Sequence, residues 1–92
     1  MASQKVCIEG SSNSHGGSTS AKSPNVYVNS KAVIRQGDAW QNHVIGDDTH
    51  SNPYITAGSS TVYANGKSIS RYGDSLSCGA TVTSGSSNVY IG

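Results

Sequence analysis

The sequence predicts an all-β fold built from short hairpins, and three observations support this prediction. Apolar residues gather into short clusters of β-branched residues and tyrosines, as they do in β-strands. A stretch of fourteen residues occurs twice, each time with the pattern of a hairpin. No window has the 3.6-residue periodicity of a helix, and glycine, which weakens helices, accounts for 11 of 92 residues.

The repeated stretch is "NVYVNSKAVIRQGD" (25–38) in one copy and "TVYANGKSISRYGD" (61–74) in the other, with seven of fourteen positions identical. Chance would give about one identity at average residue frequencies. A third segment, "GSSNVYI" (85–91), matches "GSSTVYA" (58–64) at five of seven positions. We therefore expect three Val-Tyr strands in a single domain, 1–92, with repeat one at about 15–43, repeat two at about 50–78 and a truncated third copy at about 79–92.

Each full copy predicts two strands joined by a two-residue turn. Asn65-Gly66 is a preferred pair for a type I′ turn, in which both residues need positive φ, and Asn29-Ser30 is its weaker equivalent. Gly37-Asp38 and Gly73-Asp74 are turn residues that end the second strands. Strand alternation in copy two places Lys67, Ile69 and Arg71 on one face and Ser68 and Ser70 on the other.

The core available to this chain is small. Phe is absent, Leu76 is the only leucine, and Ile, Val, Leu and Phe together supply 15 of 92 residues. The net charge is only +1, so we expect an ordered protein in spite of the small number of apolar residues. The basic residues are spread along the chain, so we expect no nucleic-acid partner. The first twenty residues lack the apolar stretch of a signal peptide, which predicts a soluble chain that is not exported by the usual signal route.

Three histidines and one cysteine mark the ends of two segments of equal length. His15 and His43 are 28 residues apart, and so are His50 and Cys78. If the two copies fold alike, these residues fall at equivalent corners and can converge on one point. A set of one cysteine and three histidines suits tetrahedral Zn²⁺. Such a metal would act as a staple for a chain with little core, and four protein ligands would leave no open position for a catalytic water.

The residues alone leave alternatives open. Three histidines are an ordinary number for this length, and no spacing is that of a zinc finger, so a generic β-rich adhesion or structural module with incidental histidines is one alternative. If one histidine is not a ligand, the open position would suit a small zinc hydrolase. Cys7 and Cys78 could form a disulfide, but nothing indicates an oxidising compartment, and Cys7 in "KVCIE" is predicted to pack as a small apolar residue.

Other chemistry has little support. The chain contains no GxSxG, GxGxxG or Walker arrangement, so we assign no catalytic residue. Asp47-Asp48 is interpreted as a solvated turn between the copies. The Ser/Gly-rich segment 10–23 is interpreted as an ordered loop, because it takes the place in copy one that residues 50–60 take in copy two.

Residues 50–92 resemble the PAAR-repeat proteins, in which a histidine precedes a G-S-x-x-V-x-x-N-G-K strand and turn, a Pro-Ala-Ala-Arg-like segment, G-D, a cysteine and a final strand. The first half resembles them more loosely, through His15-Gly16-Gly17 and Gln36-Gly37-Asp38. The Pro-Ala-Ala-Arg segment is here Ser68-Ile69-Ser70-Arg71, so only the arginine is retained. The resemblance implies a short conical β structure with pseudo-threefold character, and a metal near its apex held by His15, His43, His50 and Cys78.

The same resemblance implies a function. Such proteins are non-enzymatic tips that cap the trimeric β-helical spike of phage tails or type VI secretion systems and help pierce the target cell envelope. We expect one tip per spike trimer and a structural zinc ion, with iron as an alternative; the partner-binding residues stay unassigned. The divergent opening segment and the absence of an added effector domain favour a tip in the virion, on a phage tail baseplate, over a secretion tip delivered from the bacterial cytoplasm.

Overall fold

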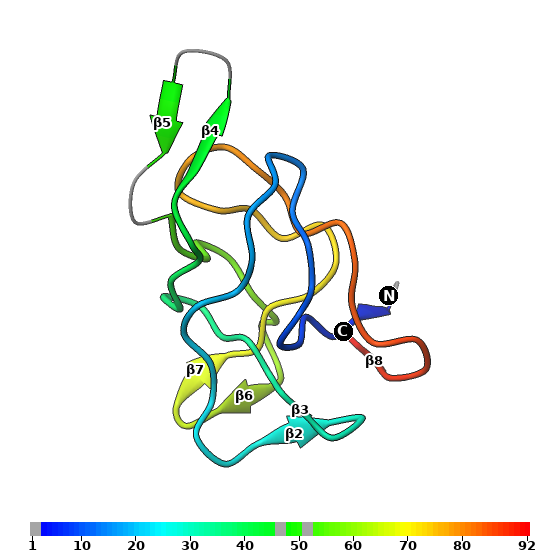
Figure 1. The fold of residues 1–92 in the computed structure, drawn as a ribbon. Coiled ribbons are helices and arrows are strands. Elements are labelled where there is room, and N and C mark those ends of the chain that lie inside the picture. Colours follow the sequence, from blue (N-terminus) through cyan, green and yellow to red (C-terminus); the bar gives the residue numbers. More distant parts are fainter. Residues whose placement is uncertain (1–2, 46–47, 51–52) are drawn as a thin grey trace.

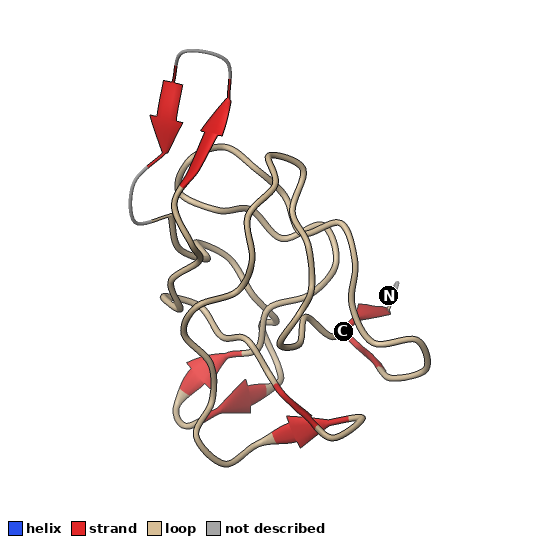
Figure 2. Ribbon diagram, viewed as in Figure 1, coloured by secondary structure: helices blue, strands red, loops and turns tan. Residues whose placement is uncertain are grey.

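The residues that the structure describes form four antiparallel pairs of very short strands, joined by long hydrogen-bonded loops (Figure 1). The structure, a computed structural model, describes residues 3–45, 48–50 and 53–92, and it describes side chains outside residues 43–50. No helix occurs in these residues (Figure 2), and none that could span a membrane is found among them. The predicted all-β class is confirmed. The strands are β1 (Gln4–Lys5), β2 (Tyr27–Val28), β3 (Lys31–Ala32), β4 (His43–Ile45), β5 (Asp48–His50), β6 (Tyr63–Ala64), β7 (Lys67–Ser68) and β8 (Tyr90–Ile91).

Both predicted hairpins form with the predicted turns. In the β2–β3 pair Val28 lies opposite Lys31, and in the β6–β7 pair Ala64 lies opposite Lys67, so each turn has two residues. The φ angles are 54° and 65° in the first turn and 54° and 77° in the second. Positive φ at both positions is the requirement of a type I′ turn. The turn residues are Asn29 and Ser30 in the first hairpin and Asn65 and Gly66 in the second.

The third Val-Tyr strand, β8, finds its partner at the other end of the chain. Tyr90 lies opposite Lys5 and Ile91 lies opposite Gln4, so β1 completes a third strand pair. Figure 1 shows the two chain ends together at this pair. We call β2–β3 unit one, β6–β7 unit two and β8–β1 unit three. Unit three is therefore a hairpin without a connecting turn.

The segments that follow the second strands of the units are also equivalent. Each contains a glycine at a φ between 88° and 92°, followed by a residue whose side chain accepts a hydrogen bond from the amide three positions earlier. Positive φ of this size favours glycine because other side chains are strained there. The segments are 6–11, 33–38 and 69–74, and the accepting atoms are Ser11 Oγ (3.1 Å), Asp38 Oδ2 (2.8 Å) and Asp74 Oδ2 (2.7 Å).

Three serines tie the units into a closed ring. Each stands three positions before the valine that precedes its unit's first strand, and each accepts a hydrogen bond from the amide of that valine at 2.9 to 3.0 Å. Each hydroxyl also donates a hydrogen bond to the next unit. The acceptor is an oxygen of the residue that directly follows the first strand of that unit. The bonds run from Ser23 to Asn65 Oδ1, from Ser59 to the Gly92 carbonyl oxygen and from Ser86 to Asn29 Oδ1.

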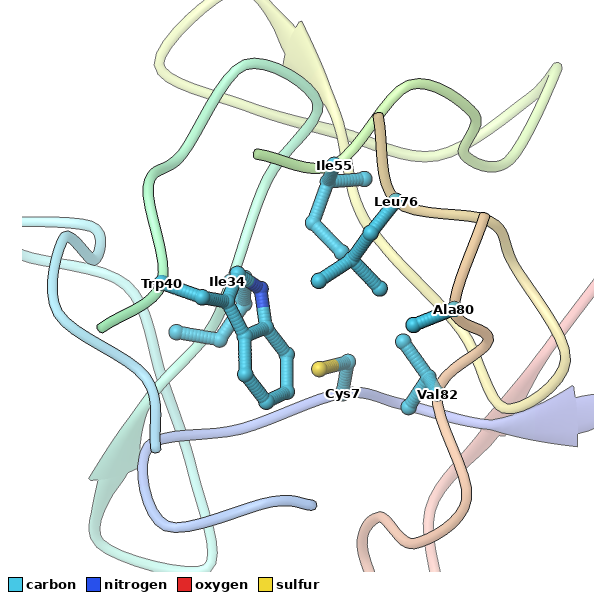
Figure 3. Packing of buried hydrophobic residues seen from close by; sticks show 7 residues of the cluster. All are labelled: Cys7, Ile34, Trp40, Ile55, Leu76, Ala80 and Val82. Carbon is cyan, nitrogen blue, oxygen red and sulfur yellow. The ribbon is translucent and has the colours of Figure 1, made fainter. Parts of the chain in front are cut away.

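The core is divided into two clusters, which we call lower and upper. The lower cluster lies between the hairpins and contains Val6, Ile8, Val33, Ala64 and Ile69. The upper cluster, shown in Figure 3, contains Cys7, Ile34, Trp40, Ile55, Leu76, Ala80 and Val82.

This division shows what lies on the two faces predicted for residues 67–71. Ile69 and Ser70 are both buried, with 6% and 0% of their surfaces exposed. Strand β7 ends at Ser68, and the following residues make single bridges to the other units. In the equivalent segments, successive residues enter different clusters, as Val6 and Cys7 do. The alternation therefore runs between two cores rather than between core and solvent.

Cys7 packs as an apolar residue, as predicted. Its side chain is fully buried, and its sulfur points toward the Trp40 ring (Figure 3), a favourable contact for sulfur. Burial raises the pKa of the Cys7 thiol to about 12, so the group stays neutral. Neither cysteine forms a disulfide.

The Ser/Gly-rich segment is ordered by backbone bonds, as predicted. The Ser14 amide donates to the Thr81 carbonyl and the Ala21 amide to the Ala39 carbonyl, both at 2.9 Å. The β4–β5 pair was not predicted. It places Asp48 in a strand rather than a turn, while Asp47 lies outside the described residues.

Candidate metal centre

The end of the molecule opposite the β2–β3 and β6–β7 hairpins is formed by the β4–β5 pair and two neighbouring loops. Figure 1 shows this pair projecting from the body, with the blue loop from the first part of the chain and the orange loop from the last part beside its root. The four predicted ligands come from these segments: His43 from β4, His50 from β5, and His15 and Cys78 from the two loops.

His15 and Cys78 occupy the same position in two matching turns. The amide of Gly16 donates to the carbonyl of Asn13 at 3.2 Å, and the amide of Gly79 donates to the carbonyl of Leu76 at 3.0 Å. The two glycines have φ angles of 91° and 93°. The third residue of each turn is the candidate ligand. The segments "SNSHG" (12–16) and "SLSCG" (75–79) are similar in sequence, and this similarity could have predicted that the two turns are equivalent.

The structure brings His15 and Cys78 together. The distance from Cys78 Sγ to His15 Nδ1 is 3.8 Å. Two ligands of one tetrahedral zinc ion, with Zn–S near 2.3 Å and Zn–N near 2.05 Å, would have their sulfur and nitrogen about 3.6 Å apart. The pair therefore fits two adjacent ligands of one zinc ion. The Asn13 carboxamide oxygen accepts a 2.8 Å bond from the His15 amide and so fixes the turn that carries His15.

The other two candidates lie opposite one another in the β4–β5 pair. The register places His43 opposite His50, Val44 opposite Thr49 and Ile45 opposite Asp48. Directly opposed residues of an antiparallel pair share a face of the pair. Both imidazoles lie outside the described side chains, and among those described there is no group of three His, Cys, Asp or Glu that could hold a metal.

Trp40 anchors the root of the β4–β5 pair. Its ring is 2% exposed in the upper cluster, and its amide donates to the Pro53 carbonyl at 2.7 Å. A bridge between Ala39 and Tyr54 closes the same root one residue earlier. The two residues that flank the segment with His43 and His50 are thus bonded to each other at the core. Sequence reasoning did not assign Trp40 this role.

Two buried carboxylates are engaged elsewhere. Asp38 makes a bidentate ion pair with Arg35, and Asp74 makes one with Arg71, with N–O distances of 2.8 to 3.1 Å. The hydrogen bonds that each guanidinium donates to its carboxylate raise the pKa of the arginine. Both carboxylates therefore serve the fold.

Comparison with known proteins identifies one family. The family model described as "PAAR motif" matches residues 9–84, which is most of the chain and includes all four candidate ligands. No curated protein matches the chain. The chain therefore belongs to the PAAR motif family.

Proposed function

We propose that this protein is a non-enzymatic, metal-stapled tip that caps and sharpens a trimeric β-helical cell-puncturing spike. The PAAR motif family is associated with the spike tips of contractile injection systems. The tip would supply a rigid point that helps pierce the target cell envelope, while the spike supplies length and force.

The observation that carries the proposal is the threefold equivalence of the strand pairs. Three tyrosines stand at the same position of β2, β6 and β8, and they are 59%, 57% and 51% exposed. A three-chain partner presents the same patch three times, so a single chain can match it only by repeating its own contact three times. Exposed aromatic residues are typical anchors of protein interfaces. We therefore assign the spike-facing surface to Tyr27, Tyr63 and Tyr90.

The opposite end supports a structural zinc site held by His15, His43, His50 and Cys78. The 3.8 Å separation of the Cys78 sulfur and the His15 nitrogen suits two ligands of one ion, and the register of β4 and β5 pairs the other two residues. A zinc ion there would cross-link two turns and one hairpin. Imidazole also suits iron, but the thiolate favours zinc. With four protein ligands the ion has no position for a reacting water, which argues against a zinc hydrolase.

Within this function, we favour a place in the virion, at the tip of a phage tail baseplate. The segment "ASQKVCIEGSSNSHGG" departs from the opening common in secretion-system tips. A type VI secretion tip, made in the bacterial cytoplasm and then delivered, would use the same fold in the same way.

Binding to the trimeric spike of the same phage or secretion system tests the proposal. Light scattering of the purified complex should give one tip chain per three spike chains. The triple variant Tyr27→Ser, Tyr63→Ser, Tyr90→Ser should lose binding, whereas Tyr54→Ser should bind like the parent, because Tyr54 is 46% exposed but lies outside the three equivalent strands. A one-to-one complex, or undiminished binding by a folded triple variant, would contradict the assignment.

A further inference from the structure

A surface hollow lies where units two and three meet. Its volume is about 230 Å³, and it is lined by Ser3, Gln4, Lys5, Tyr72 and Tyr90. The amide of Tyr72 donates to the Lys5 carbonyl at 2.8 Å, which holds the two units together at this point. Tyr72 and Tyr90 nevertheless keep 45% and 51% of their surfaces exposed. The hollow is thus walled by two aromatic rings and a lysine, and it opens to solvent.

The side chains of this hollow depart from the threefold pattern. The other two junctions make the same backbone bond, from the Gln36 amide to the Ser68 carbonyl and from the Glu9 amide to the Ala32 carbonyl, both at 2.8 Å. Tyr72 thus has Gln36 and Glu9 as counterparts. Lys5 has Ser68 and Ala32 as counterparts. Since two junctions form without this tyrosine and this lysine, the fold does not require them here.

Lys5 also brings an uncompensated positive charge to the hollow. Among the described residues, the ion pairs are Lys22–Glu9, Arg35–Asp38 and Arg71–Asp74, and Lys5 is in none of them. A lysine beside two exposed rings favours an anionic ligand that also has a flat apolar face.

We propose that this hollow binds one acidic sugar residue, of the uronic acid class. The tyrosine rings would pack against the C–H face of the sugar, and the Lys5 ammonium would pair with its carboxylate. The Ser3 hydroxyl supplies a donor and an acceptor for the hydroxyl groups. The volume is below the roughly 300 Å³ at which pockets for drug-sized ligands begin, so it suits a single ring. An acidic protein side chain would engage Lys5 but leave most of the other lining groups unused.

NMR titration of the whole protein tests this site without a spike or a membrane. Sodium glucuronate should shift the amide signals of residues 3–5, 72 and 90 with a Kd on the order of 1 mM, as expected for a small ligand in an open site. Glucose should bind at least about tenfold more weakly, because it lacks the carboxylate. Glutamate, which has the carboxylate but no ring, should also bind at least about tenfold more weakly.

Variants that copy the other junctions give matched controls. Tyr72→Gln copies Gln36 and Lys5→Ser copies Ser68, and each should weaken glucuronate binding at least about tenfold while leaving the melting temperature near that of the parent. The double variant Gln36→Tyr, Ser68→Lys should create a second site beside Tyr63. Glutamate binding as tightly as glucuronate would show recognition of acidic protein groups instead and would overturn the proposal, as would unshifted signals or unchanged binding by Tyr72→Gln. The site concerns the free tip, because Tyr90 also belongs to the proposed spike-facing surface and a bound spike would cover the hollow. Failure here would leave the proposed spike function standing.

Discussion

Two cysteines in this chain show how position decides the chemistry of one residue type. Cys7 is fully buried among apolar side chains, and burial raises its pKa to about 12, so its thiol is neutral and inert. Cys78 is partly buried in a surface turn, with its sulfur 3.8 Å from His15 Nδ1. A residue in that setting can bind a metal as thiolate, whereas Cys7 contributes only packing.

We therefore expect the two cysteines to respond differently to alanine substitution and to a chelator. Cys78→Ala should lower the stability of the metal-loaded protein by about 3 kcal/mol or more, or about 12 °C in Tm, because the staple loses a ligand. A chelator should lower the Tm of the parent but leave that of Cys78→Ala nearly unchanged. Thermal melts with and without chelator measure both effects.

Cys7→Ala is the control for lost packing. It should cost about 1 kcal/mol through the small cavity it leaves, and its Tm should still fall on chelation as in the parent. An unchanged Tm for Cys78→Ala, together with a chelator that has no effect on the parent, would contradict the metal site.

At the scale of the element, one turn geometry is built with two chemistries. In units one and two the turn that follows the second strand is braced by an arginine–aspartate pair, which is buried in unit one and partly buried in unit two. In unit three the same positions hold Ile8 and Ser11, and Ser11 Oγ alone accepts the amide bond. The bond from the backbone amide to a side-chain oxygen is therefore common to all three turns, and the ion pair is an addition that unit three lacks.

This difference predicts a non-additive pair of substitutions in unit one. Asp38→Ser should cost about 3 to 5 kcal/mol, because it leaves Arg35, which is 8% exposed, as an unpaired buried charge. Adding Arg35→Ile, which copies Ile8, should recover more than half of that loss. Urea denaturation of the parent, both single variants and the double variant gives the coupling energy. A double variant that is as unstable as the sum of the single variants would show that the pair is not a separable brace.

Some of these elements could be predicted from the sequence and others could not. The hairpins at Asn29-Ser30 and Asn65-Gly66 were predictable because local turn chemistry fixes them. The role of β1 was not, because segment 6–11 shares only Val6 and Gly10 with its equivalent in copy one and its partner strand is at the far end of the chain. The ligand candidates were found by spacing, but the contact of His15 with Cys78 follows from matching turns that the 28-residue intervals do not describe.

At the scale of the whole molecule, the three units form a closed ring, and unit three is formed by the first and last strands, β1 and β8. The serine bonds run from unit one to two, from two to three and from three back to one. The register of β1 and β8 leaves Gly92 and Ser3 at the two positions that Asn29 and Ser30 occupy in unit one. A small molecule with a Cα radius of gyration of 12.1 Å is thus held by contacts that do not depend on where the chain is cut.

We therefore expect a circular permutant to fold. Joining residue 92 directly to residue 3, with Gly92→Asn and Ser3→Gly, would give unit three a two-residue Asn-Gly turn, and the new ends would lie between Asn29 and Ser30. The permutant gains one connected turn in unit three and loses one in unit one, so its Tm should stay within about 8 °C of that of the parent. A second permutant cut between Val33 and Ile34, which are both fully buried, should not unfold cooperatively, because its charged ends would enter the core. Calorimetry of both proteins distinguishes these outcomes. If the first permutant also lacked a cooperative transition, the ring would depend on the native order of the units, and the bonds between neighbouring units would not suffice to hold it.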